Sequence, residues 1–168
     1  LAEALGALYA STGGAKWHSP WDLAKVSGSR VDMCSLTGIR CEAPNMWSTD
    51  LSIDNRNEDG DVYGMDGLQG TLPTELGLVP TLSEVVLIFQ PGLSGTIPTE
   101  LGAVSPCLDL YQSRISGTIP ETFAQQERIG ILGIAETSIS GTLPNQLLAR
   151  EYGEHFVWFE IRDTKLSG

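Results

Sequence analysis

The stretch LSGTIPTELG, residues 93–102, decides the fold, because close relatives of it recur along the chain. LQGTLPTELG spans residues 68–77, ISGTIPETFA spans 115–124, and ISGTLPNQLL spans 139–148. Their shared glycines are spaced by 25, 22 and 24 residues, at Gly70, Gly95, Gly117 and Gly141. A repeat of this length is typical of a solenoid, in which each unit buries its apolar side chains against the next unit.

A ladder of apolar residues precedes each repeated stretch and follows the pattern L-x-x-L-x-L-x-x-N-x-L. Its alternating apolar positions predict a short strand with one buried face. The glycine that follows lets the chain turn, and the proline of Thr-[Ile/Leu]-Pro begins a short convex segment. The ladder positions are Leu82, Val85, Leu87 and Leu93; Ser105, Leu108, Leu110 and Ile115; Ile129, Leu132, Ile134 and Ile139; and Phe156, Phe159, Ile161 and Leu166.

These patterns resemble the plant-type leucine-rich repeat, L-x-x-L-x-L-x-x-N-x-L-S-G-x-I-P-x-x-L-G. The resemblance implies an α/β repeat solenoid, a right-handed superhelix with a parallel β-sheet on its concave side and a helical amino-terminal cap. We expect the cap at 1–41, an irregular first repeat at 42–67 and regular repeats at 68–168. The asparagine of the family is replaced in every ladder, so its hydrogen bonds are either missing or remade by hydroxyls. The replacements are Gln90, Ser113, Thr137 and Thr164.

The cap is expected to begin with a helix, because Leu1, Leu5 and Leu8 have helical spacing and STGG then ends it. Trp17 and Trp21 match the paired tryptophans of the family's cap. The family's C-x-W-x-G-V-x-C clip is matched by Cys34, Gly38, Ile39 and Cys41, with Leu36 in the tryptophan position. The resemblance implies a Cys34–Cys41 disulfide; the alternative is two reduced cysteines. A disulfide in turn implies an oxidising compartment, either extracellular, secretory or an organelle lumen.

Residues 42–67 fit the repeat poorly and leave two registers open, one with Leu51 and Ile53 on the ladder and one with Val62 and Met65. This segment contains NRNEDGDVYGMD, which resembles a calcium-binding loop. The alternative is a solvated acidic loop without metal. The candidate calcium ligands are Asn55, Asn57, Asp59, Asp61 and Asp66.

The positions between the ladder residues are expected to face outward from the concave sheet, Ile88 and Ala135 among them. Carboxylates and aromatic side chains gather there, which favours a protein or basic-peptide partner. The alternative is that the acids only keep the chain soluble. The candidate partner-binding residues are Glu84, Val86, Phe89, Asp109, Tyr111, Glu136, Trp158, Glu160 and Arg162.

Other function classes fit less well. The net charge of −11 argues against nucleic acid and anionic membranes as partners. An enzyme is not expected, because His18 and His155 belong to opposite ends of the chain and no nucleophile, phosphate-loop or zinc motif is present. One threonine per repeat favours an ice-binding surface as a further alternative. These residues are Thr71, Thr96, Thr118 and Thr142.

Two further expectations concern the cysteine Cys107 and the last unit. Cys107 is expected to be a partly buried small hydrophobe, with an intermolecular bond as the alternative. The chain stops at LSG, within a unit and after the apolar run HFVWFEI. We therefore expect either that the repeats continue or that a partner covers the last coil, as in an accessory subunit of a larger assembly.

Overall fold

The computed structural model describes residues 1–41, 51–55, 65–105, 107–126, 130–148 and 158–167. A helical cap opens the chain and its first helix buries Leu5 and Leu8 completely, as the helical spacing predicts. The helix ends where predicted, before Gly13, whose φ of 71° requires the left-handed conformation that glycine adopts easily. The cap consists of α1 (Ala2–Ser11), η1 (Gly14–Lys16), α2 (Leu23–Val26), α3 (Arg30–Cys34) and the first strand, β1 (Ile39–Cys41).

Each following coil contributes one strand to each of two sheets. The strands of the six-stranded sheet after β1 are β2 (Leu51–Asp54), β4 (Leu82–Val86), β6 (Cys107–Asp109), β8 (Ile131–Gly133) and β10 (Trp158–Glu160). The strands of the five-stranded sheet are β3 (Gln69–Thr71), β5 (Gly92–Thr96), β7 (Arg114–Gly117), β9 (Ser138–Gly141) and β11 (Lys165–Leu166). Short helical segments close the coils: η2 (Thr74–Leu78), η3 (Leu101–Ala103), α4 (Thr122–Gln125) and α5 (Asn145–Leu148).

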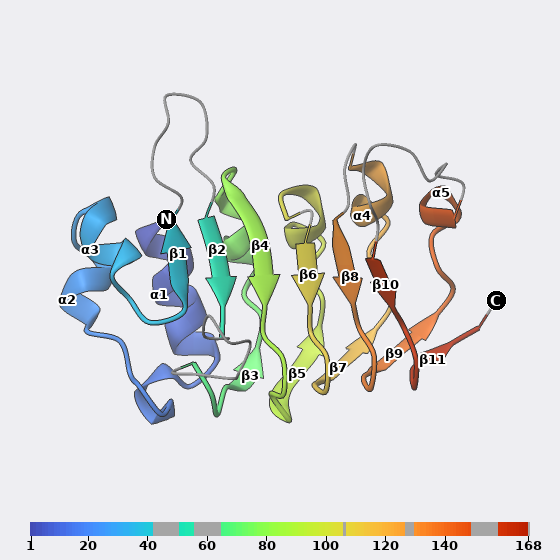
Figure 1. Ribbon diagram of the computed structural model, residues 1–168, viewed down its shortest axis with the longest axis horizontal. Coiled ribbons are helices and arrows are strands. Elements are labelled where there is room, and N and C mark those ends of the chain that lie inside the picture. Colours follow the sequence, from blue (N-terminus) through green and yellow to red (C-terminus); the bar gives the residue numbers. More distant parts are fainter. Residues whose placement is uncertain (42–50, 56–64, 106, 127–129, 149–157, 168) are drawn as a thin grey trace.

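The strands pair in the order expected of a solenoid. In the six-stranded sheet β1 and β2 are antiparallel and every later pair is parallel. Figure 1 looks onto this sheet, with the five-stranded sheet along its lower edge and the short helical segments along its upper edge. Ile53 of β2 is in register with Val85 of β4, so the first repeat uses the Leu51 and Ile53 register.

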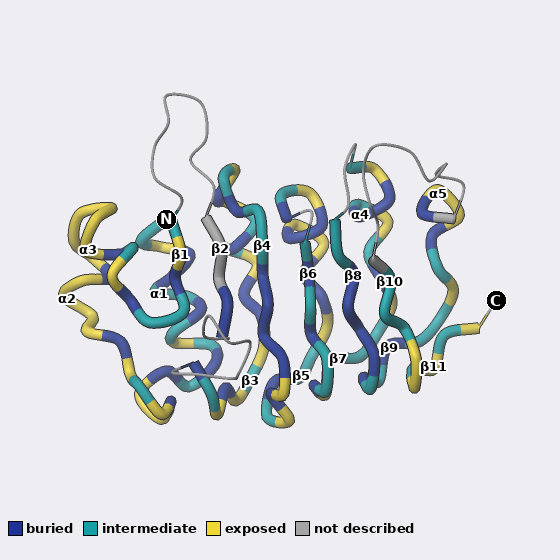
Figure 2. The backbone as a smooth tube through the Cα atoms, viewed as in Figure 1, coloured by how far each residue is buried: buried dark blue, intermediate teal, exposed yellow. Residues whose placement is uncertain are grey.

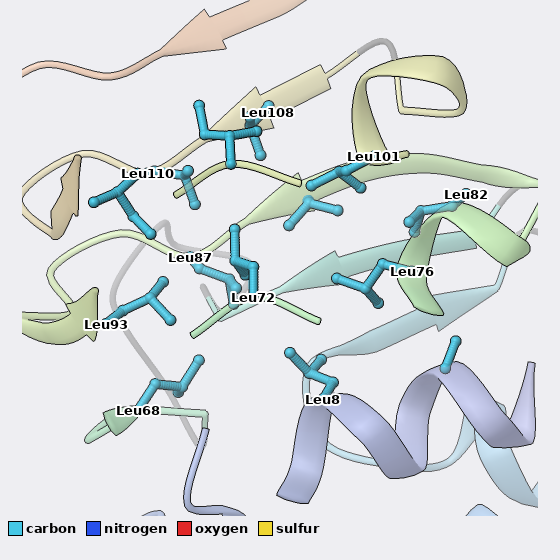
Figure 3. Packing of buried hydrophobic residues seen from close by; sticks show 14 of the residues in the cluster. Leu8, Leu68, Leu72, Leu76, Leu82, Leu87, Leu93, Leu101, Leu108 and Leu110 are labelled. Carbon is cyan, nitrogen blue, oxygen red and sulfur yellow. The ribbon is translucent and has the colours of Figure 1, made fainter. Parts of the chain in front are cut away.

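The core runs without interruption from the cap through the coils. In the described part of the chain the ladder residues from Leu82 to Ile139 are fully buried or nearly so, which confirms the ladder (Figure 2). Leu8 of the cap belongs to the same cluster as Leu76 and Leu108 of the coils (Figure 3). Phe159 and Leu166 of the last coil are half-buried against this core. Ile129 and Phe156 lie outside the described residues.

Polar side chains form hydrogen bonds in three of the four positions that asparagine occupies in the family. Gln90 accepts from the backbone of Leu68 at 2.9 Å and donates to the carbonyl of Ile88 at 3.1 Å. Thr137 and Thr164 donate to carbonyls within their own coils, at 2.7 and 3.0 Å. The buried Ser113 hydroxyl has no partner among the described residues. The two threonine hydroxyls bond within one coil, so among the described residues only Gln90 remakes a hydrogen bond between successive coils at these positions.

A second set of hydrogen bonds, which we call the serine rungs, joins successive coils in the five-stranded sheet. In each rung a serine hydroxyl donates to a glycine carbonyl of the preceding coil at 3.1 to 3.3 Å. Because the rungs repeat, every coil is fixed to its neighbour at the same place. The pairs are Ser94 with Gly70, Ser116 with Gly95, Ser140 with Gly117 and Ser167 with Gly141.

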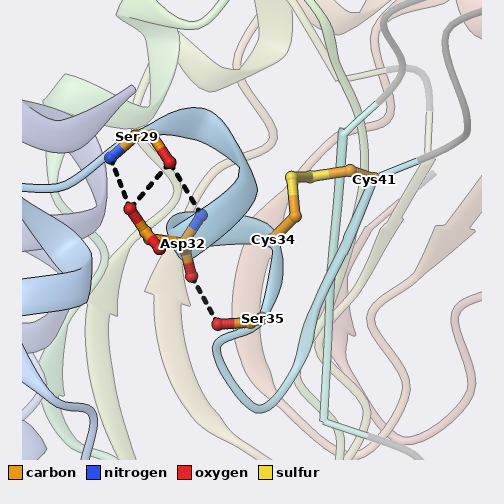
Figure 4. Close-up of a disulfide and its surroundings, with 5 residues drawn as sticks. All are labelled: Ser29, Asp32, Cys34, Ser35 and Cys41. Carbon is orange, nitrogen blue, oxygen red and sulfur yellow. Dashed lines mark hydrogen bonds between the residues drawn. A yellow bond between two sulfur atoms is a disulfide. The ribbon is translucent and has the colours of Figure 1, made fainter.

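The cap is held by aromatic packing and by a disulfide. The rings of Trp17 and Trp21 meet edge to face at 4.9 Å, and both indole N–H groups donate to backbone carbonyls. Cys34 and Cys41 form the disulfide that the resemblance implies (Figure 4). It joins α3 to β1, and α3 itself begins with a capping box between Ser29 and Asp32. These hydrogen bonds from Ser29 lower the pKa of the Asp32 carboxyl.

Candidate functional site

We define the open face as the surface of the six-stranded sheet that looks away from the core. Among the described residues of this face, Phe89 is the most exposed large apolar side chain, with 46% of its surface accessible. Most of the other predicted partner-binding residues are half-buried, and Arg162 is exposed; the half-buried ones are Glu84, Asp109, Tyr111, Glu136 and Glu160. Trp158 lies on β10, and its side chain is outside the described residues. The partner-binding role of these residues stays a prediction.

Val86, Ile88 and Ala135 were expected to face solvent, and this expectation is wrong. Their exposed fractions are 1%, 8% and 0%. Val86 lies in register between Asp54 and Asp109 of the flanking strands. Val86 is therefore removed from the candidate surface.

Six side chains meet at the turn end of this sheet and form what we call the Tyr111 cluster, which consists of Phe89, Tyr111, Gln112, Glu136, Glu160 and Arg162. The backbone brings them together, because the turn of each coil donates to the turn of the next. Phe89 N donates to Tyr111 O at 2.8 Å, and Glu136 N donates to Arg162 O at 3.0 Å. The cluster thus spans four successive coils.

The hydroxyl of Tyr111 is the centre of the cluster. It donates to Glu136 Oε1 at 2.9 Å and accepts from Gln112 Nε2 at 3.1 Å and from Arg162 Nη2 at 3.3 Å. Arg162 is two coils further along the chain, so the tyrosine crosses the intervening coil, where Ala135 is fully buried. A small residue at that position gives the ring room to lie along the sheet.

Phe89 rests on the other side of Tyr111. The two ring centroids are 5.1 Å apart with an interplanar angle of 79°, an edge-to-face arrangement. Arg162 places its guanidinium carbon 5.4 Å from the Tyr111 ring centroid, within the range of a cation–π contact. Tyr111 is therefore held from both sides.

The backbone adopts a costly conformation at the same place in four successive coils. Four residues without a glycine's freedom have φ between 53° and 56° and occupy the same repeat position: Phe89, Gln112, Glu136 and Asp163. Each such residue costs about 1–2 kcal/mol relative to the right-handed conformation. Three of the four belong to the cluster and the fourth, Asp163, forms an ion pair with Arg162, so the left-handed turn is what aims Gln112 and Glu136 toward Tyr111.

Ion pairs extend the cluster to the last coil. Arg162 Nη1 lies 3.0 Å from Glu136 Oε1, and Arg162 Nε lies 3.2 Å from Glu160 Oε1. Hydrogen bonds from Gln112 and Tyr111, followed by the charge of Arg162, lower the pKa of the Glu136 carboxyl. The hydrogen bond to Tyr111 and the carboxylate of Glu160 raise the pKa of Arg162. The cluster is thus organised around ionised groups.

This arrangement predicts a loss of stability in acid that depends on Glu136. Its pKa is lower in the folded than in the unfolded chain, so its contribution is present above its ordinary pKa of 4.5 and is lost as pH falls through the folded value. We expect Glu136→Gln to reduce the drop in melting temperature between pH 6 and about pH 3. The exposed Glu121→Gln serves as the control, and an equal drop in wild type and Glu136→Gln would contradict the assignment.

The thiol of Cys107 lies half-buried on β6 and is free. Its burial raises the pKa of the thiol, and the nearby carboxylate of Glu84 raises it further. A thiol with a raised pKa is a poor nucleophile, as expected for a partly buried small hydrophobe.

The candidate calcium loop is only partly within the described residues, since Asn57, Asp59 and Asp61 lie outside them. Asn55 is fully buried, donates to the carbonyl of Ile88 at 2.8 Å and accepts from the N–H of Ile88 at 3.1 Å. Both ends of its amide therefore bind backbone, so its assignment as a calcium ligand was wrong. Asp66 is half-buried, its backbone carbonyl accepts from His18, and its Oδ1 has no partner among the described residues. Calcium binding stays a prediction that no longer includes Asn55.

The threonines of the repeat all lie exposed along the five-stranded sheet: Thr71, Thr96, Thr118 and Thr142. Their methyl groups lie against the glycines of the following coils. A Cβ built on Gly95, Gly117 or Gly141 would lie 2.8, 2.9 or 3.0 Å from the Cγ2 of the preceding threonine. The file is therefore regular from coil to coil.

Several solved structures of plant proteins are similar to this fold. The ectodomain of BIR2 from Arabidopsis thaliana superimposes with a TM-score of 0.74 at 25% identity, over 99% of this chain and 81% of that one. The chain thus has the fold of a plant-type leucine-rich-repeat ectodomain. No family model and no curated protein matches this leucine-rich-repeat chain in sequence.

Two other solved structures share the leucine-rich-repeat fold. A chain of the BIR3–SERK2 complex from Arabidopsis thaliana has a TM-score of 0.64 at 22% identity, over 98% of this chain and 82% of that one. A plant ice-binding protein has a TM-score of 0.66 at 20% identity, over 98% of this chain and 48% of that one. Within the described part of this leucine-rich-repeat chain, no helix has the length and hydrophobicity needed to cross a bilayer.

Proposed function

We propose that the chain is a non-catalytic recognition module that binds a protein or peptide partner on its open face, at the Tyr111 cluster. The observation that carries this proposal is Phe89, which is 46% exposed and yet fixed against Tyr111 at 5.1 Å. Aromatic side chains in such positions supply most of the binding energy of many interfaces. An exposed phenylalanine on an ordered support is therefore suited to anchor a partner.

The hydrogen bonds within the cluster also support a role in binding. Tyr111, Gln112, Glu136 and Arg162 hold one another through hydrogen bonds of 2.6 to 3.3 Å. Side chains fixed in this way lose little conformational freedom when a partner docks, which lowers the cost of association. The same bonds occupy the polar groups with one another, which suits a binding surface better than a catalytic site.

Two further observations agree with this role. One of the similar structures is described as a complex of two proteins, BIR3 and SERK2. The Cys34–Cys41 disulfide fits an oxidising compartment, and we place the protein in the extracellular space or the secretory pathway.

Site-specific photo-crosslinking tests the proposal. A benzophenone amino acid is placed at Phe89 in the whole chain, and at Leu78 in a control chain. Leu78 is also an exposed apolar residue, with 62% of its surface accessible, and lies on η2 instead of the open face. We expect adducts with one partner protein from position 89 and none from position 78. Equal adducts from both positions, or none from position 89, would contradict the proposal.

The same experiment separates a reversible partner from a permanent assembly. An accessory subunit would give adducts in a fixed ratio that persist in high salt and co-migrate with a large complex on gel filtration. A recognition module would give adducts that decrease as salt rises, because interactions between exposed charges are screened over about 10 Å at 0.1 M salt.

We propose ice binding as a second candidate function, because the threonine file is exposed and regular. Neighbouring parallel strands place equivalent threonines about 4.8 Å apart, and the serine rungs hold this spacing from coil to coil. The test is thermal hysteresis of the isolated chain, compared with a Thr96→Val, Thr118→Val double variant. Hysteresis in the wild type that the double variant reduces would support this function, and no hysteresis in the wild type would exclude it.

A further inference from the structure

The open face is acidic in the coils that carry the Tyr111 cluster. The strands of the six-stranded sheet from β4 to β10 and the turns that follow them carry five described carboxylates around the guanidinium of Arg162, namely Glu84, Asp109, Glu136, Glu160 and Asp163. Nearer the cap, Arg40 Nη1 lies 3.4 Å from Asp54 Oδ2, so the charges of these two side chains cancel. The local charge therefore has the sign of the whole chain, whose net charge is −11.

Arg162 demonstrates which group this surface accommodates. Its guanidinium lies beside the ring of Tyr111 while two of its nitrogens bind the carboxylates of Glu136 and Glu160. A guanidinium held by an aromatic ring and by carboxylates combines a cation–π contact with charge-assisted hydrogen bonds. The arginine neutralises only part of the surrounding charge, since Asp163 is a third carboxylate within 3.7 Å of it.

We infer that the partner on the open face presents a cationic segment, in which a lysine or arginine stands next to an apolar side chain. The cation is attracted by the carboxylates of the open face, and the apolar side chain packs on the exposed Phe89. This inference rests on the proposed function and names the chemistry of its partner. Complementary charge of this kind raises the rate of association and disfavours acidic competitors.

Selection from a random 12-residue peptide library on the whole chain tests this inference. We expect the selected peptides to carry lysine or arginine beside an aromatic or aliphatic residue. Glu160→Gln is expected to weaken their binding about two- to fivefold, the range for a single exposed ion pair. Glu121→Gln removes the same charge at the start of α4 and is expected to leave affinity unchanged. Raising salt from 0.05 to 0.5 M should weaken binding in the same direction.

Other outcomes would overturn either the inference alone or the proposed function as well. Neutral or acidic peptides that bind the wild type and lose affinity in Phe89→Ser would overturn the cationic segment and leave the proposed function standing. Failure to select any peptide, or peptides that bind Phe89→Ser as well as wild type, would overturn both. Melting curves of each variant confirm that it is folded, so a loss of affinity is caused by the altered surface and not by unfolding.

Discussion

Replacing Leu108 by alanine is expected to lower the free energy of unfolding by about 2–5 kcal/mol. Leu108 is completely buried, and its strand, β6, pairs with β4 on one side and with β8 on the other. The substitution removes apolar contacts and leaves a cavity in the middle of the stack, where the coils on both sides limit collapse. Urea denaturation followed by circular dichroism measures the effect as a shift of the midpoint.

Leu78→Ala is the matched control for this prediction. Leu78 is a leucine of the same repeat region with 62% of its surface exposed, so its loss should change the free energy of unfolding by no more than about 0.5 kcal/mol. A small effect of Leu108→Ala, within that same limit, would contradict the position of Leu108 in the core. A change of slope in the denaturation curve would indicate that the coils no longer unfold together.

Replacing Asn55 by alanine is expected to cost about 1–3 kcal/mol. The amide of Asn55 accepts from Ile88 N and donates to Ile88 O, and Ile88 O also receives a hydrogen bond from Gln90. The substitution therefore leaves the N–H of Ile88 buried without its partner, which carries the full cost of its lost hydration. Thermal and urea denaturation in the presence of a chelator measure this cost without any contribution from calcium.

Asn145→Ala provides the control for Asn55, because Asn145 is exposed at the start of α5. We expect it to change stability by no more than about 0.5 kcal/mol. The contrary result would be an Asn55→Ala variant that matches wild type with chelator present and loses stability only when calcium is added to both. Such a result would restore Asn55 to the calcium loop.

The fold was predictable because its signals are local and repeated. Leu132 of β8 alternates with Ile134 just after the strand, and Leu108 and Leu110 do the same in the coil before, so each repeat indicates independently which residues are buried. The glycine and proline of each unit mark the turns in the same way. The cap was predictable from a resemblance that covers Cys34 and Cys41, and the disulfide follows it.

The site was predictable only in part, because its contacts join residues far apart in sequence. The hydroxyl of Tyr111 meets Arg162, 51 residues later, by crossing the coil of Ala135. No local pattern indicates that Ala135 is buried, so the alternation of strand residues placed it wrongly on the surface. Gln112 was expected to face outward but not to bind Glu136, a contact that depends on a left-handed φ of 53°. Asn55 was assigned to the calcium loop because acidic residues surround it in the sequence. Its hydrogen bonds to Ile88 of the next coil have no local sequence signal.

The serine rungs have a mechanical consequence. Each rung joins one coil only to the coil before it, so a force applied between the cap and the last coil loads the coils in series. The last coil, whose Phe159 and Leu166 are only half-buried, should detach first, and the disulfide-bonded cap should yield last. Each detached coil would release about 80 Å of extended chain. Under such a force the chain would lengthen in steps of one repeat.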